Sequence, residues 1–583
     1  MDRDLESIQQ VRLLIEKAAE AQKILARFGQ EEIDAVVAAM ADAARRSAEP
    51  LARLAVEETT YGVVADKVEK NLFSSRDVFS AIKNMKTVGV IAEDRENGVV
   101  EIAEPVGVVA AIIPCTNPTS TAIFKGLISL KARNAVVMSP HPSAVHCIAE
   151  SVNVMREAAV QAGAPPGSLG CVTLVSNEAT QELMRHRSTA VILATGGAGM
   201  VRSAYSSGKP ALGVGPGNVP AYIHSSANIQ KAVADILTGK CFDNGTICSS
   251  EQHMVVDRAI ADQVRAEAER QGGFFLTADQ ARAVARLLIL PNFRVNPVMV
   301  GQSAERIAKE AGIALPPGKR ALIAPLDGIG RGHPLSAEKL SPVLSFFVVK
   351  DCHEGADVCR RLLEFGGMGH TMAIHAADDE IIRALALQLP AFRIVVNTPA
   401  PFGSIGYSTR LMPSMSLGCG THGGNITTDN LSPRNLLNIK RLAYERKPVN
   451  PPATAIIPAA AKEPSRKSPV AAPSAAVAEQ PPAPVSSGIP NPAEIAKLVE
   501  RFLAAKEPAS STRESQGANA PGAQPKDPPA AASPPVRPVD FVSEADVRRA
   551  IEKGEKIAVG PKTIITPSAR DLGEPHDIFF SAS

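Results

Sequence analysis

The sequence lacks a charge imbalance, and this removes the electrostatic reason to expect a polyanionic partner. Its 62 basic and 60 acidic residues give a formal net charge of +2 over 583 residues. Binding to nucleic acid or to a membrane surface depends on clustered positive charge. We therefore expect no nucleic acid and no membrane as the main partner, and small molecules or other proteins instead.

Long apolar runs and paired cysteines are also missing. No apolar stretch approaches the roughly 18–20 residues that a membrane helix requires. The first residues, Met1 to Asp4, are charged and lead into an amphipathic helix without the apolar core of a signal peptide. The eight cysteines form no CxxC pair and no metal-ligand pattern. We expect free thiols, no bound metal and a reducing, cytosolic location.

Residues 1–449 alternate short β-branched runs with amphipathic runs. Strands that alternate with helices indicate parallel sheets covered by helices, so the predicted fold class is α/β. The first helix places apolar residues such as Val11, Ile15 and Ala18 at helical spacing. The expected strands are 108–113, 135–138, 191–194, 221–223 and 394–396, and the expected helices include 119–131 and 144–162.

One cysteine differs from the others because it follows a tight Asn-Gly turn. Cys248 ends the segment FDNGTIC, which lies between a helical run ending near Lys240 and an apolar run over 254–256. A thiol on a turn between two rigid elements can be aimed at a substrate, whereas a thiol in a core cannot. The sequence therefore predicts Cys248 as a nucleophile.

Two strand-to-helix junctions carry candidate polar groups. Asn117 follows the strand 108–113, where an open α/β sheet places ligands, and its amide can donate to an oxyanion. The alternative is a turn asparagine that bonds its own backbone. Thr195, Gly196 and Gly197 follow the strand 191–194, and bare amides at a helix start bind phosphate. Their spacing is not GxGxxG, so an ordinary glycine turn remains an alternative.

Together these segments resemble the aldehyde dehydrogenase superfamily, specifically its coenzyme-A-acylating branch. That branch includes the aldehyde dehydrogenase half of bifunctional alcohol/aldehyde dehydrogenases, and the propanal and acetaldehyde dehydrogenases of bacterial microcompartments. The resemblance implies two Rossmann-like domains with parallel sheets and an oligomerisation element. It covers residues 5–445 and rests on seven ordered blocks, at 113–142, 193–218, 242–252, 338–343, 366–371, 397–406 and 416–425.

The resemblance also implies roles for individual residues. Cys248 is the nucleophile, and Asn117 forms an oxyanion hole with the backbone amide of Cys248. His370 matches a histidine typical of the acylating branch; it either handles the coenzyme A thiol or is a buried structural histidine. Glu338 matches the acid that bonds the nicotinamide ribose. The implied NAD-binding set is Thr195, Gly196, Gly197, Ser139, Pro140, Glu338, Gly215 and Pro114, and the implied aldehyde pocket is Thr246, Ile247, Phe402 and Ile405.

Two departures from the hydrolytic aldehyde dehydrogenases are informative. Ser139 stands where many have a lysine for the adenine ribose, and Val214 stands where they have a glutamate base. Val214 cannot activate water, and general-base assistance is worth ~10²–10⁴-fold. A thiol with a pKa near ~8.5 needs less help. The expected reaction converts a short aldehyde, propanal or acetaldehyde, to its acyl-CoA. The alternatives are a hydrolytic enzyme that yields free acid and a non-catalytic compartment scaffold.

The expected domains are a cofactor domain (1–225), a catalytic domain (226–415) and a return to the cofactor domain and oligomerisation element (416–449). The family favours a homodimer or homotetramer. Pro/Ala-rich composition predicts flexible linkers over 450–490 and 508–541. The tail 542–583 is predicted to be a small accessory module, with Ser543 as helix cap, Gly554 as stop, and strand-like pieces at Ile557–Val559 and Thr563–Ile565.

Residues 491–507 form an amphipathic island between the two linkers. Asn491 and Pro492 suit a helix start, and the apolar residues that follow share one helical face. Such a helix either packs on the protein's own surface or docks into a groove of another protein. It resembles the encapsulation peptides of bacterial microcompartments, which implies a shell protein as partner and the compartment lumen, within the bacterial cytoplasm, as location. The apolar face consists of Ile495, Leu498, Val499, Phe502 and Leu503.

Overall fold

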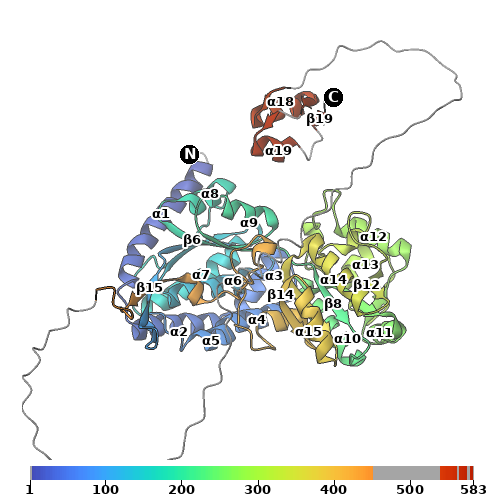
Figure 1. The fold of residues 1–583 in the computed structure, drawn as a ribbon, viewed down its shortest axis with the longest axis horizontal. Helices are drawn as coiled ribbons and strands as arrows, with labels where there is room; N and C mark the ends of the chain where they lie inside the picture. Colours follow the sequence, from blue (N-terminus) through green and yellow to red (C-terminus); the bar gives the residue numbers. More distant parts are fainter. Residues whose placement is uncertain (1–2, 451–538, 561–562, 574–577, 582–583) are drawn as a thin grey trace, which may run out of the picture. The chain divides into compact units, whose positions relative to one another are not determined.

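The computed structural model describes residues 3–450, 539–560, 563–573 and 578–581 (Figure 1). The chain divides into two compact units, residues 1–457 and 458–583. None of the helices among the described residues is long and apolar enough to span a bilayer. The predicted helix over 491–507 and both predicted linkers lie outside the described residues, apart from Asn450 and residues 539–541.

The first sheet of the larger unit has five parallel strands in the order β5-β4-β3-β6-β7. Every residue of β3 and β4 is buried, as expected for strands with helices on both faces. From β3 the chain adds strands first on one side and then on the other, so the order reverses between β3 and β6. The strands are β3 (Val108–Ile113), β4 (Ala135–Pro140), β5 (Leu169–Cys171), β6 (Thr189–Thr195) and β7 (Ala211–Val214).

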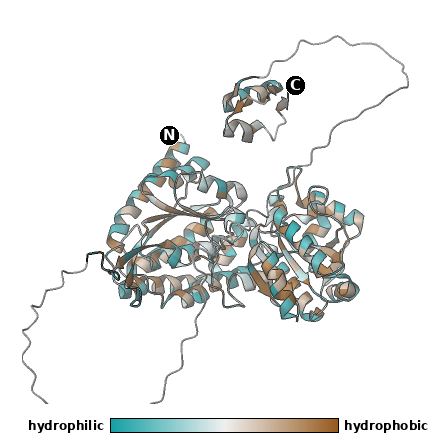
Figure 2. Cartoon of the chain, viewed as in Figure 1, coloured by the Kyte–Doolittle hydropathy of each residue, from teal (hydrophilic) through white to brown (hydrophobic). Residues whose placement is uncertain are grey.

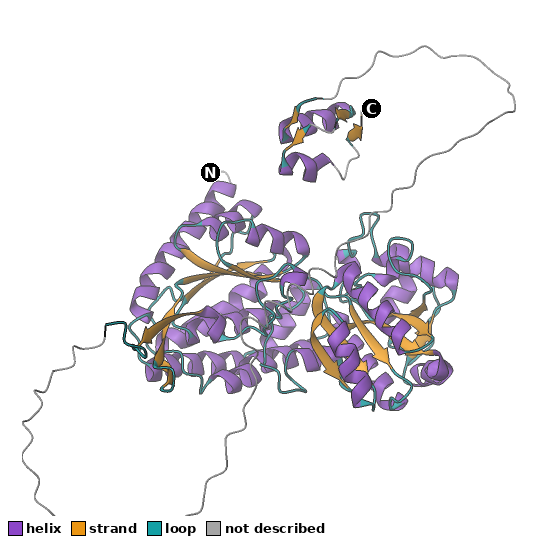
Figure 3. Ribbon diagram, viewed as in Figure 1, coloured by secondary structure: helices purple, strands orange, loops and turns teal. Residues whose placement is uncertain are grey.

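Helices cover this sheet on both faces (Figures 1 and 3). Helix α1 packs on α8 and β4, whereas α2, α6 and α7 pack on one another. The predicted apolar stripe of the first helix is confirmed, because Val11, Ile15 and Ala18 are fully buried. The helices are α1 (Arg3–Leu25), α2 (Gln30–Arg46), α3 (Ala48–Thr59), α6 (Pro118–Lys131), η2 (Pro142–Ala144), α7 (Val145–Gln161), α8 (Asn177–Arg185) and α9 (Ala198–Tyr205).

A helix with a π-helical interruption precedes both sheets in sequence and bonds to segments from each of the two sheet regions. Its parts are α4 (Val64–Leu72), the π-segment η1 (Phe73–Val78) and α5 (Phe79–Ile82). Such π-bulges are frequent at functional sites. Helix α4 carries two buried lysines, Lys67 and Lys70, which bond to residues of both sheet regions.

The second sheet has seven parallel strands in the order β10-β11-β12-β9-β8-β13-β14. Alternate side chains of β8 enter opposite cores: Ala221 and Ile223 pack beside α10 and α11, and Tyr222 packs beside α14. Figure 2 shows the apolar residues concentrated along these strands. The strands are β8 (Val219–Ile223), β9 (Glu251–Asp257), β10 (Gly273–Phe275), β11 (Ala321–Pro325), β12 (Val343–Val349), β13 (Gly369–His375) and β14 (Ala391–Val396).

The changeover between the sheets differs from the predicted domain boundary at residue 225. Strand β8 pairs with β9 and β13, so the chain has already entered the second sheet at Val219. The loop 215–218 connects the last strand of the first sheet to β8. The remaining helices of this region are α10 (Ile229–Cys241), η3 (Phe242–Gly245), η4 (Arg258–Ile260), α11 (Ala261–Arg270), α12 (Ala278–Leu288), η5 (Pro297–Met299), α13 (Ala304–Glu310), η6 (Pro334–Ser336), α14 (Cys352–Gly366), α15 (Asp379–Gln388) and α16 (Ala400–Ser404).

A small antiparallel sheet returns the chain to its first half. Strand β15 pairs with β2, which in turn pairs with β1. Leu437 of β15 pairs with Pro105, the last residue of β2, shortly before β3 begins. The last strand of the larger unit therefore pairs with the segment that leads into the five-stranded sheet. The elements are β1 (Gly89–Asp94), β2 (Val99–Pro105), η7 (Thr421–Gly423), η8 (Pro433–Leu436) and β15 (Leu437–Ala443).

The smaller unit follows its predicted local pattern. Ser543 and Asp546 form a capping box at the start of its first helix, and Gly554 ends that helix with a left-handed φ of 68°. Both features are confirmed, as are the two short strands after the helix. The elements are β16 (Phe541–Val542), α18 (Glu544–Lys553), β17 (Ile557–Val559), β18 (Ile564–Ile565), α19 (Pro567–Gly573) and β19 (Phe579–Ser581).

Candidate active site

Cys248 lies on a strained turn between α10 and β9. The three residues Asp243, Asn244 and Gly245 adopt left-handed backbone conformations in succession, with φ of 50°, 51° and 74°. A non-glycine residue in this region costs free energy, and such strain persists only where the surroundings hold it. The turn therefore needs strong local anchors.

The main anchor is the carboxylate of Asp243, which is fully buried. It accepts hydrogen bonds from Lys67 at 2.9 Å and from the backbone amide of Val63 at 2.7 Å, and it pairs closely with Lys70. Burial alone would raise the pKa of Asp243, but Lys67 and Lys70 outweigh burial and lower this pKa. The turn is thus tied to α4 by a buried ionic cluster.

Asn117 is brought to the same place from the first sheet. It caps α6, directly after β3, with Pro118 at the first helical position. Its Oδ1 accepts from Lys70 Nζ at 2.7 Å, and its Nδ2 donates to the backbone oxygen of Thr246 at 3.2 Å. The amide donor therefore lies against the turn that carries Cys248, which is where an oxyanion donor is required.

Cys248 is partly exposed, and its thiol is held in the neutral form. Burial raises its pKa to about 12, with further contributions from the charges of Glu338 and Cys419, while Arg393 opposes them. A thiolate is the reacting species in nucleophilic attack. The thiol must therefore lose its proton as it reacts.

Glu338 and His370 also lie near Cys248. Glu338 Oε1 accepts from the amide of Gly217 at 3.2 Å, and burial raises its pKa to about 7. A side chain on Gly217 would place its Cβ 2.0 Å from the Cys248 carbonyl oxygen and 3.3 Å from His370 Cγ. The glycine loop, the nucleophile and the histidine are therefore in direct contact.

His370 is fully buried, with Nδ1 2.9 Å from the Thr371 hydroxyl. Its Nε2 has no hydrogen-bond partner. Burial and, secondarily, Arg393 lower its pKa to about 3, so the imidazole is neutral at neutral pH. A buried, unpartnered ring nitrogen beside a nucleophile is available to a substrate group.

The predicted dinucleotide site lies at the carboxyl edge of the first sheet. Thr195 ends β6, its hydroxyl is buried without a partner, and Gly197 caps α9. Pro114 follows β3, the neighbouring strand, so the two turns meet where the strand order reverses, the usual ligand position in such sheets. An unsatisfied buried hydroxyl beside free helix-start amides fits a bound dinucleotide.

Other residues predicted for this site lie on the same edge with different surroundings. Ser139 and Pro140 end β4; Ser139 is buried, and its hydroxyl lies 3.0 Å from that of Thr180. Gly215 follows β7 and is partly exposed, whereas Gly196 donates to the carbonyl of Val214 at 3.4 Å.

The predicted pocket residues are not all equivalent. Thr246 is buried, and its hydroxyl bonds to Asp243 and Lys70, so it supports the turn. Phe402 packs edge-on against Phe242 at 4.9 Å. Ile247 is buried at the turn, and Ile405 lies in the hydrophobic core around the first sheet.

The sequence analysis missed Lys67, Lys70 and Arg393. Arg393 is buried, donates to the carbonyl of Thr428 at 3.0 Å and lies near Cys248 and Cys419. Lysines 67 and 70 are three apart on one helical face, but charged helix residues are usually exposed, so this spacing alone gives little signal.

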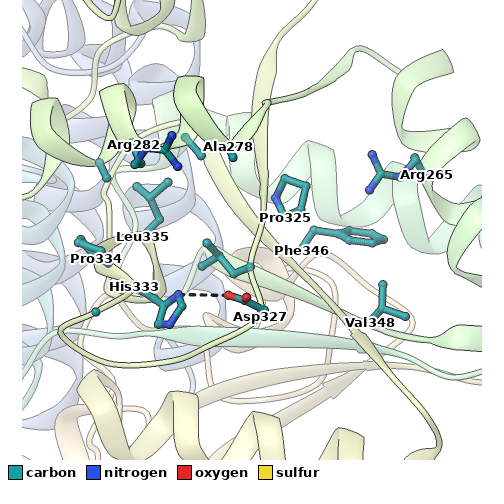
Figure 4. A pocket seen from close by; sticks show the side chains of 14 residues that line it. Arg265, Ala278, Arg282, Pro325, Asp327, His333, Pro334, Leu335, Phe346 and Val348 are labelled. Carbon is teal, nitrogen blue, oxygen red and sulfur yellow. Dashed lines mark ion pairs between the residues drawn. The ribbon is translucent and has the colours of Figure 1, made fainter.

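A cavity of about 800 Å³ lies elsewhere in the second sheet domain (Figure 4). Arg265, Arg282 and Phe346 line it, as do His333 and Asp327, whose side chains lie 3.4 Å apart. None of its lining residues belongs to the site around Cys248. Volume alone therefore does not identify the reactive site in this molecule.

A cysteine on a turn beside an asparagine amide, together with a separate sheet edge that fits a dinucleotide, is the arrangement expected of oxidoreductases that work through a thiol nucleophile. The model of the aldehyde dehydrogenase family matches residues 5–272. The bifunctional aldehyde-alcohol dehydrogenase of Escherichia coli is 42% identical over 442 residues, 75% of this chain and 50% of that protein. The chain thus spans about half the length of the first curated relatives that it matches.

Other relatives match over nearly their full length. The succinate-semialdehyde dehydrogenase (acetylating) of Clostridium kluyveri is 37% identical, over 76% of this chain and 97% of that protein. The crystal structure of an acetylating aldehyde dehydrogenase from Geobacillus thermoglucosidasius is 52% identical with a TM-score of 0.76, over 77% of this chain and 99% of that one. The chain belongs to the aldehyde dehydrogenase family, and the predicted resemblance and fold class are confirmed.

Two solved propionaldehyde dehydrogenases are more distant. One, from a fucose utilisation microcompartment of Clostridium phytofermentans, is 29% identical with a TM-score of 0.68, over 75% of this chain and 97% of that one. The other, from Rhodopseudomonas palustris, contains bound CoA and an acylated cysteine; it is 26% identical with a TM-score of 0.68, over 75% of this chain and 97% of that one.

The charge of Glu338 suggests a test of the site's electrostatics. Replacing Glu338 with Gln removes a negative charge that raises the Cys248 pKa, so the thiol should ionise more readily. We expect alkylation of Cys248 by iodoacetamide at pH 8 to accelerate about threefold to tenfold in Glu338→Gln. Peptide mass spectrometry measures the rate at this residue, with Cys248→Ser as the blank. An unchanged rate would show that the two groups do not interact.

Proposed function

We propose that the protein oxidises a short aldehyde with NAD and transfers the acyl group to coenzyme A. The observation that carries the proposal is the contact of the Asn117 amide with the Cys248 turn, and it is supported by a buried valine at the end of β7. Val214 is 2% exposed and pairs with Thr195 of the cofactor turn. By the family resemblance, hydrolytic members have their glutamate base at this position. Because valine has no basic group, residue 214 cannot deprotonate a water molecule.

The first half-reaction uses Cys248 and Asn117. Cys248 Sγ forms a bond to the aldehyde carbon and loses its proton, and the carbonyl electron pair moves to oxygen. The Asn117 amide and the backbone amide of Cys248 donate to this oxygen. A bound nicotinamide cofactor supplies the acceptor for the hydride that leaves the carbon. The C=O bond then re-forms, leaving a thioester on Cys248.

The second half-reaction releases the acyl group. The coenzyme A thiol loses its proton and attacks the thioester carbon, the same two donors hold the oxygen, and the bond to Cys248 breaks. Cys248 leaves as the thiolate and regains a proton. His370 is neutral and has a free Nε2, so it is suited to accept a hydrogen bond from the attacking thiol. Support comes from the Rhodopseudomonas propionaldehyde dehydrogenase structure, which contains both bound CoA and an acylated cysteine.

Propanal or acetaldehyde is the proposed substrate, and a bacterial microcompartment in the bacterial cytoplasm is the proposed location. The similarity to propionaldehyde dehydrogenases, one of them from a microcompartment, supports both proposals. Residues 491–507 would bind the shell protein. A homodimer or homotetramer is proposed from the family.

The nucleophile provides the first test. Cys248→Ala removes the sulfur atom that carries the acyl group in this mechanism, so CoA-dependent NADH formation from propanal should fall at least ~10³-fold. Cys241→Ala is the matched control, because Cys241 ends the preceding helix and its thiol lies 3.4 Å from the Arg320 carbonyl. Absorbance at 340 nm measures both. Retention of more than a tenth of the activity in Cys248→Ala would exclude the mechanism.

The missing base provides the second test, and it also decides between acylating and hydrolytic chemistry. Val214→Glu should raise the formation of free propanoate in the absence of coenzyme A by about tenfold or more, because a carboxylate can activate water. Val214→Gln has nearly the same shape without the base and should not do so. If wild type and Val214→Glu release acid at equal rates, water is excluded by another cause.

The proposed location is tested separately. Residues 485–508 fused to a fluorescent protein should form puncta in cells that assemble shells. Replacing Leu498 and Phe502 with Ser in the fusion removes the apolar face and should make the fluorescence diffuse. Diffuse fluorescence of the unmodified fusion beside intact shells would contradict a targeting role.

A further inference from the structure

The ammonium group of Lys70 is saturated by three acceptors. It donates to Asn117 Oδ1 at 2.7 Å and to the Thr246 hydroxyl at 3.0 Å, and it pairs closely with Asp243. An ammonium group has three N–H donors and no acceptor. The side chain is 3% exposed, so water is not an alternative partner.

This contact determines which way the Asn117 amide faces. The oxygen and nitrogen of an asparagine amide are nearly identical in shape, so hydrogen bonds decide its orientation. Lys70 can only donate, and therefore Oδ1 must face Lys70. Nδ2 then faces the nucleophile turn, where it lies 3.2 Å from the Thr246 oxygen and 3.3 Å from the Thr116 hydroxyl. If the Asn117 amide were rotated by 180°, Nδ2 would face the Lys70 ammonium group, and two hydrogen-bond donors would oppose each other.

We propose that Lys70 is a positioning residue for the reaction: it holds Asn117 Oδ1 so that the amide presents its N–H donors to the oxyanion formed at Cys248. A positive charge at Oδ1 also polarises the amide and strengthens donation by Nδ2. The inference rests on the proposed role of Asn117 as the oxyanion donor. Burial lowers the pKa of Lys70 to about 8, so the ammonium form is retained at neutral pH.

The neighbouring lysine lacks this connection. Lys67 lies on the same helix, is equally buried and pairs with the same Asp243 carboxylate. Its other contact is the backbone oxygen of Thr116, at 3.1 Å. Lys67 therefore shares the structural role of Lys70 in holding the turn but does not bond to the amide, which makes it a matched control.

A double-mutant cycle separates positioning from structural support. Asn117→Ala should lower kcat/KM for the aldehyde by ~10²–10³-fold, the usual effect of losing one oxyanion donor. We expect Lys70→Met to lower kcat/KM by about tenfold to a hundredfold in the wild type, and by less than about threefold in Asn117→Ala. KM for NAD should change little. Lys67→Met should reduce activity by the same factor in both backgrounds.

Three outcomes would overturn the proposal. The first is equal factors for Lys70→Met with and without Asn117, and the second is coupling of the same size for Lys67→Met. The third is full activity in Lys70→Met. Circular dichroism and thermal unfolding establish that each variant is folded, and Lys70→Gln, which can donate or accept, replaces Lys70→Met if the latter unfolds. Loss of the Cys248 dependence, by contrast, would contradict the proposed function and not the role of Lys70.

Discussion

The carboxylate of Asp243 holds the reactive part of this molecule together. This carboxylate is buried together with the ammonium groups of Lys67 and Lys70 from α4. The backbone of Asp243 itself has a left-handed conformation. Removing one partner of a buried ionic cluster typically costs about 3–5 kcal/mol, because a charge is left without compensation. Here the cost would fall directly on the turn before Cys248. The strained backbone, Cys248 and Asn117 therefore depend on one buried group.

The parallel sheets determine where the other functional groups meet. Asn117 and Thr195 follow neighbouring strands of the first sheet at the point where the strand order reverses. Cys248 precedes β9 and His370 lies on β13, the two neighbours of β8 in the second sheet. The loop 215–218 joins the two sheets, and Gly217 contacts both Cys248 and His370. A short connection between two rigid sheets thus brings a cofactor edge and a nucleophile turn together.

Much of the fold was predictable because its signals are local. The strands 108–113 and 191–194 are runs of buried β-branched residues, and the Ser543–Asp546 capping box requires only neighbouring residues. Cys248 and Asn117 could be singled out as candidates from their turns, and the structure brings these two turns together. Their common anchor was not, because the bond between Lys70 and Asp243 joins residues 173 apart in sequence. The place where the chain passes from one sheet to the other was not predictable either, since pairing partners and not composition assign β8 to the second sheet.

This separation along the chain affects the order in which the protein can fold. Lys67 and Lys70 leave the ribosome long before Asp243 is synthesised. Until then, the two ammonium groups of α4 lack the carboxylate that neutralises them in the folded protein. Over the same period the acceptors available to these lysines are the neutral oxygens of Thr116 and Asn117. Burying α4 therefore costs least once the turn that carries Asp243 has formed, which favours late assembly of this region during synthesis.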